Sequence, residues 1–300
     1  MPIISFVGSK GGSLKTACAL SVSAEAARRG LRVTLVDCDP QSSATRSLPR
    51  RVNLADNLDN SLAPQETVLD PLSAEGVSVE FEEITAGGGS LRLFRGGEML
   101  AQAAREQVVR HVQRAASGAD LVIVDTAPYL TGTFAPMLAA DLVIIPTEPT
   151  GDALRSVPQY VQAVRAVAPN TPYRILLTKT VDVERTTKDA PALIDAQFPG
   201  VRLQASIPSS ARGKESNAHL VPTVFYAIDK RDRAVRTAYI ALTTELLRLT
   251  GLALGTAQLL PVHADDIATP QHEATMETAL DTPPPAAPAS SQADLGEMAP

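Results

Sequence analysis

A glycine- and lysine-rich stretch near the start of the chain has the residue types that hold phosphate. It reads "GSKGGSLKTA", residues 8–17, and lies between an apolar run and a helical segment. At such a junction, backbone N–H groups and the helix dipole attract an anion. We expect the glycines to let the backbone wrap a phosphate, Lys15 to neutralise its outer charges and the Thr16 hydroxyl to bind Mg²⁺. A chance turn is the alternative, because Leu14 stands where the general phosphate-loop pattern has its second glycine.

Three carboxylates lie at the ends of strand-like apolar runs. Asp37 and Asp39 belong to "VTLVDCDPQSSAT", residues 33–45, and Asp125 belongs to "DLVIVDTAP", residues 120–128. Residues two apart in an extended chain point to the same side, so Asp37 and Asp39 are expected to face one site. Open α/β sheets bind ligands at the carboxyl ends of their strands, where an acid holds Mg²⁺ directly or through water. Taken singly, each motif also fits an ordinary polar strand end.

Short runs dense in β-branched and aliphatic residues recur between helical stretches. They span residues 3–8, 32–37, 121–125, 142–147, 173–178 and 201–207. Their apolarity is continuous rather than alternating, which indicates strands covered on both faces, as in a parallel sheet flanked by helices. The sequence therefore predicts the α/β class.

Two helices frame this pattern. The first is predicted over 15–29, with Gly30 as its C-cap. The last is predicted over 232–249, with a core face formed at helical spacing by Val235, Tyr239, Leu242, Leu246 and Leu249. Residues 46–100 are interpreted as irregular connections with one short strand near 91–94.

The end of the chain differs in composition from the rest. Beyond Arg248 there is no Lys or Arg, while seven acids account for the net charge of −6 and leave the rest of the chain near neutral. The residues from about 261 are rich in Pro, Ala and Ser and lack aromatics. Such a segment buries too little apolar area to offset its ordering entropy, so we predict that it is disordered. A stiff acidic tether or a partner-binding arm is the alternative.

The composition excludes several classes of protein. Trp is absent and aromatics make up 4% of the chain, which argues against base-stacking surfaces for single strands. Cys18 and Cys38 are too few for a disulfide scaffold or a Cys-ligated metal, and we expect them to be buried small side chains. The four scattered histidines are expected at the surface. No signal peptide or membrane-spanning run is apparent, so we expect a cytoplasmic protein.

Taken together and in this order, the motifs resemble a known family. "KGGSLKT" (10–16) matches the deviant Walker A pattern, "DCDPQSSAT" (37–45) resembles its D-x-D-P-Q motif, and the segment 125–149 looks like its Walker B and switch region. These belong to the ParA/MinD branch of P-loop ATPases, and 207–247 resembles the closing segment of the ParA subfamily. The resemblance implies a P-loop NTPase fold, a mostly parallel twisted sheet with helices on both faces. It covers roughly residues 1–250 as an ATPase domain, followed by a low-complexity tail over 251–300.

The resemblance also implies roles for individual residues. Lys10 would reach across an ATP-dependent homodimer to the partner's phosphates, and Asp39 would position the attacking water. Thr16, Asp37 and Asp125 would hold Mg²⁺, with Asp125 acting through water. The catalytic set is then Lys10, Lys15 and Asp39, and the ATP contacts are Gly11, Gly12, Ser13, Leu14, Lys15, Thr16 and Ala17.

The sequence departs from the family's pattern at three positions, Leu14, Ala17 and Ala127. If position 14 needs a left-handed backbone, a residue other than glycine costs about 1–2 kcal/mol there, or roughly tenfold in affinity. We therefore predict a weaker or slower ATP site, not an inactive one.

The resemblance extends to partners. ParA-like dimers bind double-stranded DNA without sequence preference, and a ParB-like adaptor stimulates their slow hydrolysis. Here the matching basic residues are Arg212, Lys214, Lys230, Arg231, Arg233 and Arg236. Arg233 and Arg236 are three apart and are expected to share an exposed helix face, for which simple solvation is the alternative.

The implied function is DNA partitioning by a cytoplasmic, nucleoid-associated ATPase, with no membrane partner. A MinD-like ATPase would carry a basic amphipathic helix at its C-terminus, which the basic-free tail does not offer. Positioning of a protein cargo stays open, and a P-loop metabolic ligase or an iron–sulfur reductase component would need substrate residues or a cysteine pair that are not apparent.

Overall fold

The computed structural model describes the chain in several stretches, all within one compact unit, Met1–Pro261. The described residues are 1–8, 14–47, 77–79, 89–97, 100, 103–127, 135–210 and 230–252. The tail predicted over 251–300 therefore lies outside the described residues except for its first two positions.

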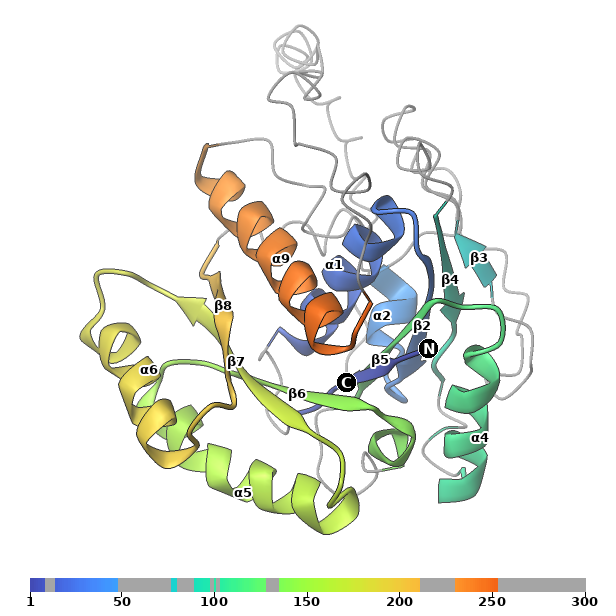
Figure 1. Ribbon diagram of the computed structural model, residues 1–300, viewed down its shortest axis with the longest axis horizontal. Coiled ribbons are helices and arrows are strands. Elements are labelled where there is room, and N and C mark those ends of the chain that lie inside the picture. Colours follow the sequence, from blue (N-terminus) through green and yellow to red (C-terminus); the bar gives the residue numbers. More distant parts are fainter. Residues whose placement is uncertain are drawn as a thin grey trace, which may run out of the picture. The chain divides into compact units, whose positions relative to one another are not determined.

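Among the described residues, eight strands form one sheet in the order β3-β4-β2-β5-β1-β6-β7-β8 (Figure 1). The strands are β1 (Ile3–Phe6), β2 (Arg32–Cys38), β3 (Val77–Val79), β4 (Ser90–Phe94), β5 (Leu121–Thr126), β6 (Leu142–Thr147), β7 (Tyr173–Thr180) and β8 (Arg202–Pro208). Every pairing is parallel except β3 with β4, which is antiparallel.

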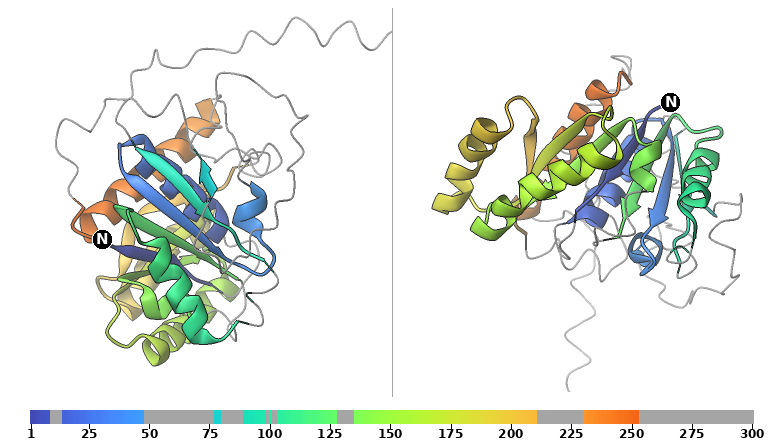
Figure 2. Two further views of the ribbon diagram at one scale, coloured as in Figure 1. Left: turned by 90° about the vertical axis from the view of Figure 1, so that its right-hand side faces the viewer. Right: turned by 90° about the horizontal axis from the view of Figure 1, so that it is seen from below.

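Helices cover both faces of the sheet (Figure 2). One face carries α1 (Lys15–Arg28) and α9 (Lys230–Leu249), and the other carries α4 (Arg105–Ala115), α5 (Gly151–Val167) and α6 (Arg185–Gln197). The short elements α2 (Ser43–Ser47) and η2 (Pro136–Ala139) complete the described set. In β5, Leu121 and Ile123 pack with the α1 and α9 side, while Val122 and Val124 pack with the α4 side. Burial on both faces explains the continuous apolar runs and confirms the predicted fold class.

Most predicted elements are confirmed, and β3 is the clear omission. All six apolar runs and the strand near 91–94 are strands, and the first helix ends next to Gly30, which has a φ of 90°. Three residues are too short a stretch to carry a period-2 pattern, so β3 has no signal in the sequence. None of the described helices is long and apolar enough to cross a membrane.

Two predictions about burial are wrong. His111 was expected at the surface, but it is 2% exposed and its ring lies edge-on to Phe94, with ring centroids 5.5 Å apart. It follows Val108 by three positions on α4 and so shares that helix's buried face. Leu249 was expected in the core face of α9 and is 39% exposed, because α9 ends there; Leu247 is buried instead. The four other predicted α9 core residues and both cysteines are buried as expected.

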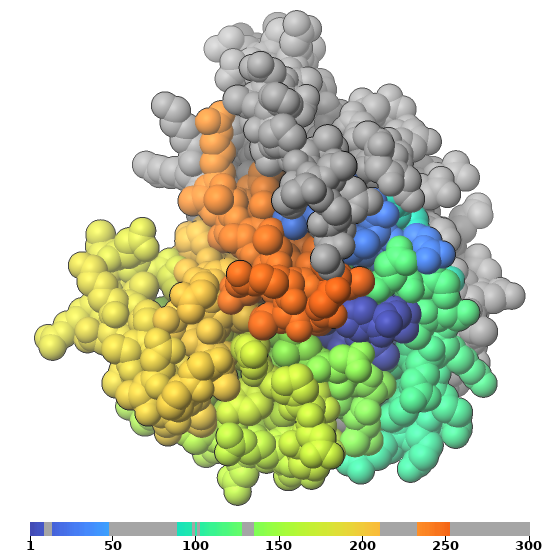
Figure 3. All heavy atoms as spheres, in the orientation of Figure 1, coloured from blue at the N-terminus to red at the C-terminus, as the bar shows by residue number. Residues whose placement is uncertain are grey.

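Helix α9 lies at the surface of the molecule (Figure 3). Helix α1 packs beside it on the same face of the sheet, with α1 over β2 and β5 and α9 over β8. Its small side chains allow this close packing, and its carboxyl end is tied to α9 by a buried ion network. Glu25 is fully buried and accepts from Arg29 Nε at 2.8 Å and from Arg28 Nε at 2.7 Å. Arg29 in turn donates to Thr244 Oγ1 and to the Ile240 carbonyl, both at 2.9 Å. The helix that starts at Lys15 is thus anchored at its far end.

Arg29→Ala is expected to lower the free energy of unfolding by about 3 kcal/mol, because it leaves the buried Glu25 with Arg28 as its remaining partner and removes two hydrogen bonds to α9. Urea denaturation followed by circular dichroism measures the loss. The matched control is Arg155→Ala, which removes an exposed ion pair with Asp152 and should cost less than about 0.5 kcal/mol. Equal losses for the two variants would contradict a stabilising role for the network.

Candidate functional site

The three predicted carboxylates meet at the carboxyl edge of the sheet. Strand β5 lies between β1 and β2, and its Asp125 is in register with Asp37 of β2 and Phe6 of β1. Two acids on neighbouring strands therefore stand side by side. Asp39 follows β2 directly, and Lys15, the first residue of α1, is close enough to Asp125 and Asp39 for both charges to affect its pKa.

Leu14 is the N-cap of α1 and has a left-handed backbone, with φ 62° and ψ 20°. Position 14 therefore has the left-handed backbone on which the predicted strain depends. For a residue other than glycine, that strain costs about 1–2 kcal/mol. Its side chain is half-buried and packs against the core beneath α1. The burial of this apolar side chain offsets part of the strain energy, which gives a physical reason for leucine at this position.

Asp37 is fully buried and its two oxygens are occupied by hydrogen bonds from the protein. Oδ1 accepts from the Asp39 amide at 3.0 Å, and Oδ2 accepts from the Thr45 amide at 2.7 Å and from its hydroxyl at 2.6 Å. Burial raises the pKa of Asp37 to about 6, against the lowering effect of these hydrogen bonds.

Asp39 is 4% exposed and its carboxylate is held by the residues that follow it. Oδ1 accepts from the Gln41 amide at 2.8 Å, and Oδ2 accepts from the Ser43 hydroxyl at 3.0 Å. The Ser42 amide also donates to the Asp39 carbonyl at 2.8 Å. These local bonds form the turn that leads into α2 and fix the direction of the carboxylate.

Asp125 is also fully buried, but neither of its oxygens has a hydrogen-bond partner among the described residues. Burial, and then the neighbouring charge of Asp37, raise the pKa of Asp125 to about 8. Thr16 is near enough to offset part of this rise, although the pair does not reach hydrogen-bonding geometry. A buried carboxylate in this condition is costly unless a cation pairs with it.

Among the described residues, the site has three buried acids and one buried base, because Lys15 is only 6% exposed. Burial lowers the pKa of Lys15, and the charges of Asp125 and Asp39 oppose that shift. The excess of negative charge and the all-oxygen donor set suit Mg²⁺. No cluster of three or more acidic, His or Cys side chains able to cage a metal occurs in the described part of the chain. One or two carboxylates commonly hold Mg²⁺ together with phosphate oxygens.

Comparison with known proteins assigns the family. A family model described as an AAA domain matches residues 1–176, more than half of the chain. The chain belongs to this AAA domain family. The sporulation initiation inhibitor protein Soj of Bacillus subtilis is 28% identical over 256 residues, which cover 81% of this chain and 97% of Soj.

Solved structures share the fold. A putative plasmid partition protein from Borrelia burgdorferi bound to AMPPNP superposes with a TM-score of 0.61 at 18% identity, covering 82% of this chain and 99% of that one. The septum site-determining protein MinD of Pyrococcus horikoshii, complexed with Mg-ADP, gives 0.59 at 19% identity, covering 85% and 99%. These structures show that the fold is shared, while the family model and the match to Soj make the chain a ParA-like ATPase.

The structure brings together part of the predicted ATP site of this ParA-like chain. Lys15, Asp37, Asp39 and Asp125 converge, and Thr16 lies beside them, half-buried. The Ala17 side chain is buried, at 7% exposed. The other predicted ATP contacts lie outside the described residues; they are Lys10, Gly11, Gly12 and Ser13.

The predicted basic face is only partly as expected. Arg233 is exposed, but Arg236 is half-buried and its Nε is enclosed without a hydrogen-bond partner among the described residues. The two therefore do not form a fully exposed pair, because position 236 lies next to the buried stripe of α9. Only the backbone of Lys230 and Arg231 is described, and Arg212 and Lys214 lie outside the described residues.

Two residues close to the carboxylates were not singled out from the sequence, Thr45 and Gly96. Thr45 is the last residue of the quoted "DCDPQSSAT" motif, so its position was available as a signal. Gly96 follows β4, and a Cβ there would lie 2.7 Å from the Asp39 carbonyl oxygen and 2.8 Å from Asp37 Cγ. Nothing in the local sequence indicates that contact, since it depends on how β4 pairs with β2.

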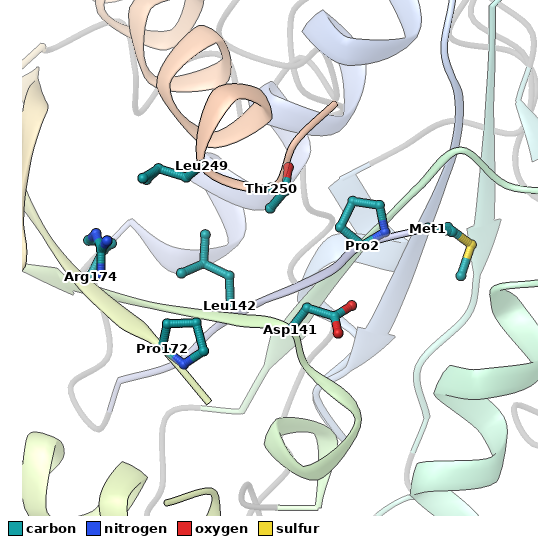
Figure 4. A pocket seen from close by; sticks show the side chains of 8 residues that line it. All are labelled: Met1, Pro2, Asp141, Leu142, Pro172, Arg174, Leu249 and Thr250. Atoms are coloured by element: carbon teal, nitrogen blue, oxygen red, sulfur yellow. The ribbon is translucent and has the colours of Figure 1, made fainter. Parts of the chain in front are cut away.

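A cavity of about 440 Å³ lies at the opposite edge of the sheet (Figure 4). Its lining includes Met1 and Pro2 before β1, Asp141 and Leu142 at the start of β6, and Arg174 of β7. These are the amino ends of the strands, whereas the carboxylates lie at the carboxyl ends. The cavity is therefore separate from the candidate site.

Asp125→Asn is expected to stabilise the protein in EDTA by about 1–3 kcal/mol at pH 8, because it removes a buried charge without a partner. The folded-state pKa of Asp125 is above its unfolded value, so ionisation opposes folding. The penalty is absent below about pH 4 and grows as the pH rises through about 8. Thermal melts from pH 5 to pH 8 should show a widening gap between variant and wild type.

The matched control is Asp120→Asn. Arg32 lowers the pKa of Asp120 through a hydrogen bond and its charge, so ionisation favours folding there and this variant should show no stabilisation. A melting temperature for Asp125→Asn at or below that of the wild type throughout the range would contradict the destabilising effect assigned to the buried Asp125 charge.

Proposed function

We propose that this chain is an ATP-dependent DNA-partitioning ATPase. It dimerises on ATP, binds double-stranded DNA without sequence preference, and hydrolyses ATP slowly until a ParB-like partner stimulates it. The observation that carries the proposal is the convergence of Lys15, Asp39 and Asp125 at the amino end of α1, in a chain that aligns with nearly the whole of Soj. Its place of action would be the cytoplasm, on the nucleoid.

The site supports nucleotide and magnesium binding. The orphaned oxygens of Asp125 and the Thr16 hydroxyl are the groups that would hold Mg²⁺, with Asp37 in the surrounding shell. The ion would neutralise charge on the phosphates. Lys15 would neutralise the outer phosphates from the protein side, and Lys10 would do so from the partner protomer. That the Borrelia protein is bound to AMPPNP and MinD to Mg-ADP supports both ligands.

Asp39 is the residue best placed to orient an attacking water. Its carboxylate is fixed in direction by Gln41 and Ser43 and remains within the electrostatic reach of Lys15. Phosphoryl transfer depends mainly on positioning and charge stabilisation, so a fixed acceptor beside the phosphate site is the feature hydrolysis needs.

Helix α9 offers the DNA-binding surface of the proposal. Its first turns contain four basic residues, and Arg233 among them is exposed. The helix packs on α1, whose first residue is Lys15, so the proposed DNA surface and the ATP site share one rigid pair of helices. Half-buried Arg236 would contribute charge from the flank of this surface.

Asp39→Asn is expected to reduce ATP hydrolysis by about 100-fold or more while the Kd for ATP stays within about threefold, because the substitution removes a water acceptor and keeps the shape. Phosphate release under excess ATP and fluorescence titration with a labelled ATP measure the two quantities. Asp182→Asn, an exposed acid after β7, is the control and should match the wild type. Unchanged hydrolysis in Asp39→Asn would refute the assigned role.

DNA binding is expected to require ATP and to weaken steeply with salt, because each neutralised phosphate releases counterions. Arg233→Glu should weaken it and lower the slope of log K against log salt by roughly one per protomer. Lys188→Glu, an equal charge change at an exposed position on α6, should leave both unchanged. Cosedimentation with DNA tests this, and cosedimentation with liposomes tests membrane binding. Full DNA retention by Arg233→Glu would contradict the assignment of the DNA-binding surface to α9.

A further inference from the structure

Thr45 links three separate elements at the candidate site. It lies in α2, and both its amide and its hydroxyl donate to Asp37 Oδ2 at the end of β2, at 2.7 and 2.6 Å. The same hydroxyl oxygen accepts from the amide of Gly96, after β4, at 2.9 Å. The hydroxyl is therefore used as a donor on one side and as an acceptor on the other, which fixes its orientation.

Gly96 is the part of this link that tolerates no side chain. An added Cβ would lie 2.8 Å from Asp37 Cγ and 2.9 Å from Asp37 Oδ1, both closer than real Cβ contacts allow. It would also lie 2.7 Å from the Asp39 carbonyl oxygen. The backbone of the loop after β4 therefore packs directly against both aspartates, and this close approach requires glycine.

The link continues to Asp39. Asp37 Oδ1 accepts from the Asp39 amide at 3.0 Å, so the orientation of Asp37 sets the backbone from which the Asp39 carboxylate projects. All of these groups are buried or half-buried, where a hydrogen bond is strong and its loss leaves a polar group unpaired. Asp125, one strand away, takes part in no such bond among the described residues.

We propose that Thr45 and Gly96 are positioning residues for hydrolysis. Through Asp37 they hold Asp39 in the orientation needed to place the attacking water. This inference rests on the proposed ATPase function and adds to it two residues that touch neither water nor phosphate. A purely structural role for Thr45 would depend on its shape and volume, whereas positioning depends on its hydroxyl, and that difference is measurable.

The test compares Thr45→Val, which keeps the shape and removes the hydroxyl, with Thr45→Ser, which keeps the hydroxyl. Thr45→Val should lower kcat for ATP by about tenfold or more while KM changes less than about threefold, because geometry for the reaction is lost and binding is kept. Thr45→Ser should retain kcat within about threefold of the wild type. Wild-type kcat in Thr45→Val, or equal losses of kcat and KM in both variants, would overturn the proposal.

Gly96→Ala tests the positioning role independently of Thr45. It should lower kcat as Thr45→Val does, because the new methyl displaces Asp37 and Asp39. Gly151→Ala is the matched control: its Cβ would meet only the flexible end of Arg155, at 3.4 Å, and its kcat should not change. If Gly96→Ala fails to fold, the threonine pair decides the question.

Failure of the inference is distinguishable from failure of the proposed function. A wild type that hydrolyses no more ATP than Asp39→Asn defeats the proposed function itself. In that event, amide hydrogen exchange over residues 37–47 decides the positioning claim without any catalysis. Exchange about tenfold faster in Thr45→Val than in Thr45→Ser supports the hydroxyl link, and equal exchange in the two variants overturns it.

Discussion

The structure depends on one electrostatic constraint, the burial of two carboxylates side by side on neighbouring strands. Asp37 and Asp125 are in register on β2 and β5, and both are fully buried. Like charges opposite each other destabilise a sheet, and burial of a carboxylate without hydrogen-bond partners, as at Asp125 among the described residues, is costly. The surrounding sheet must therefore supply the stability that this edge lacks, which it does through apolar packing on both faces.

Helix α1 connects this edge to the rest of the core. It starts at Lys15, the one base among the buried acids of the site in the described part of the chain, and ends where Arg28 and Arg29 hold the buried Glu25. Lys15 therefore belongs to a helix whose residues are nearly all buried and whose Arg29 donates hydrogen bonds to α9. A helix fixed at its far end holds the Lys15 ammonium beside Asp125 and Asp39, as preorganised electrostatics would require.

The sequence predicted the sheet, and the placement of the acids at its carboxyl edge, because both depend on local patterns. Continuous apolar runs are strands, and an acid at the end of such a run lies at the carboxyl edge whatever the rest of the chain does. Other features depend on how the elements end and pack. His111 is buried because α4 turns that face inward, Leu249 is exposed because α9 ends there, and Gly96 matters only because β4 pairs with β2.

Asp37 and Asp125 show most clearly what sequence patterns leave undecided. Each is an aspartate at the end of an apolar strand, and the motifs assign both to Mg²⁺. The structure separates them: Asp37 uses both oxygens to organise Thr45 and Asp39, while Asp125 keeps both oxygens free of protein donors in the described part of the chain. An acceptor whose lone pairs are engaged by N–H and O–H donors is a weaker cation ligand than one with none. The same residue type thus divides into an organiser of the turn around Asp39 and an acid whose oxygens have no protein donor among the described residues, and hydrogen bonds from Thr45 and Asp39 determine which is which.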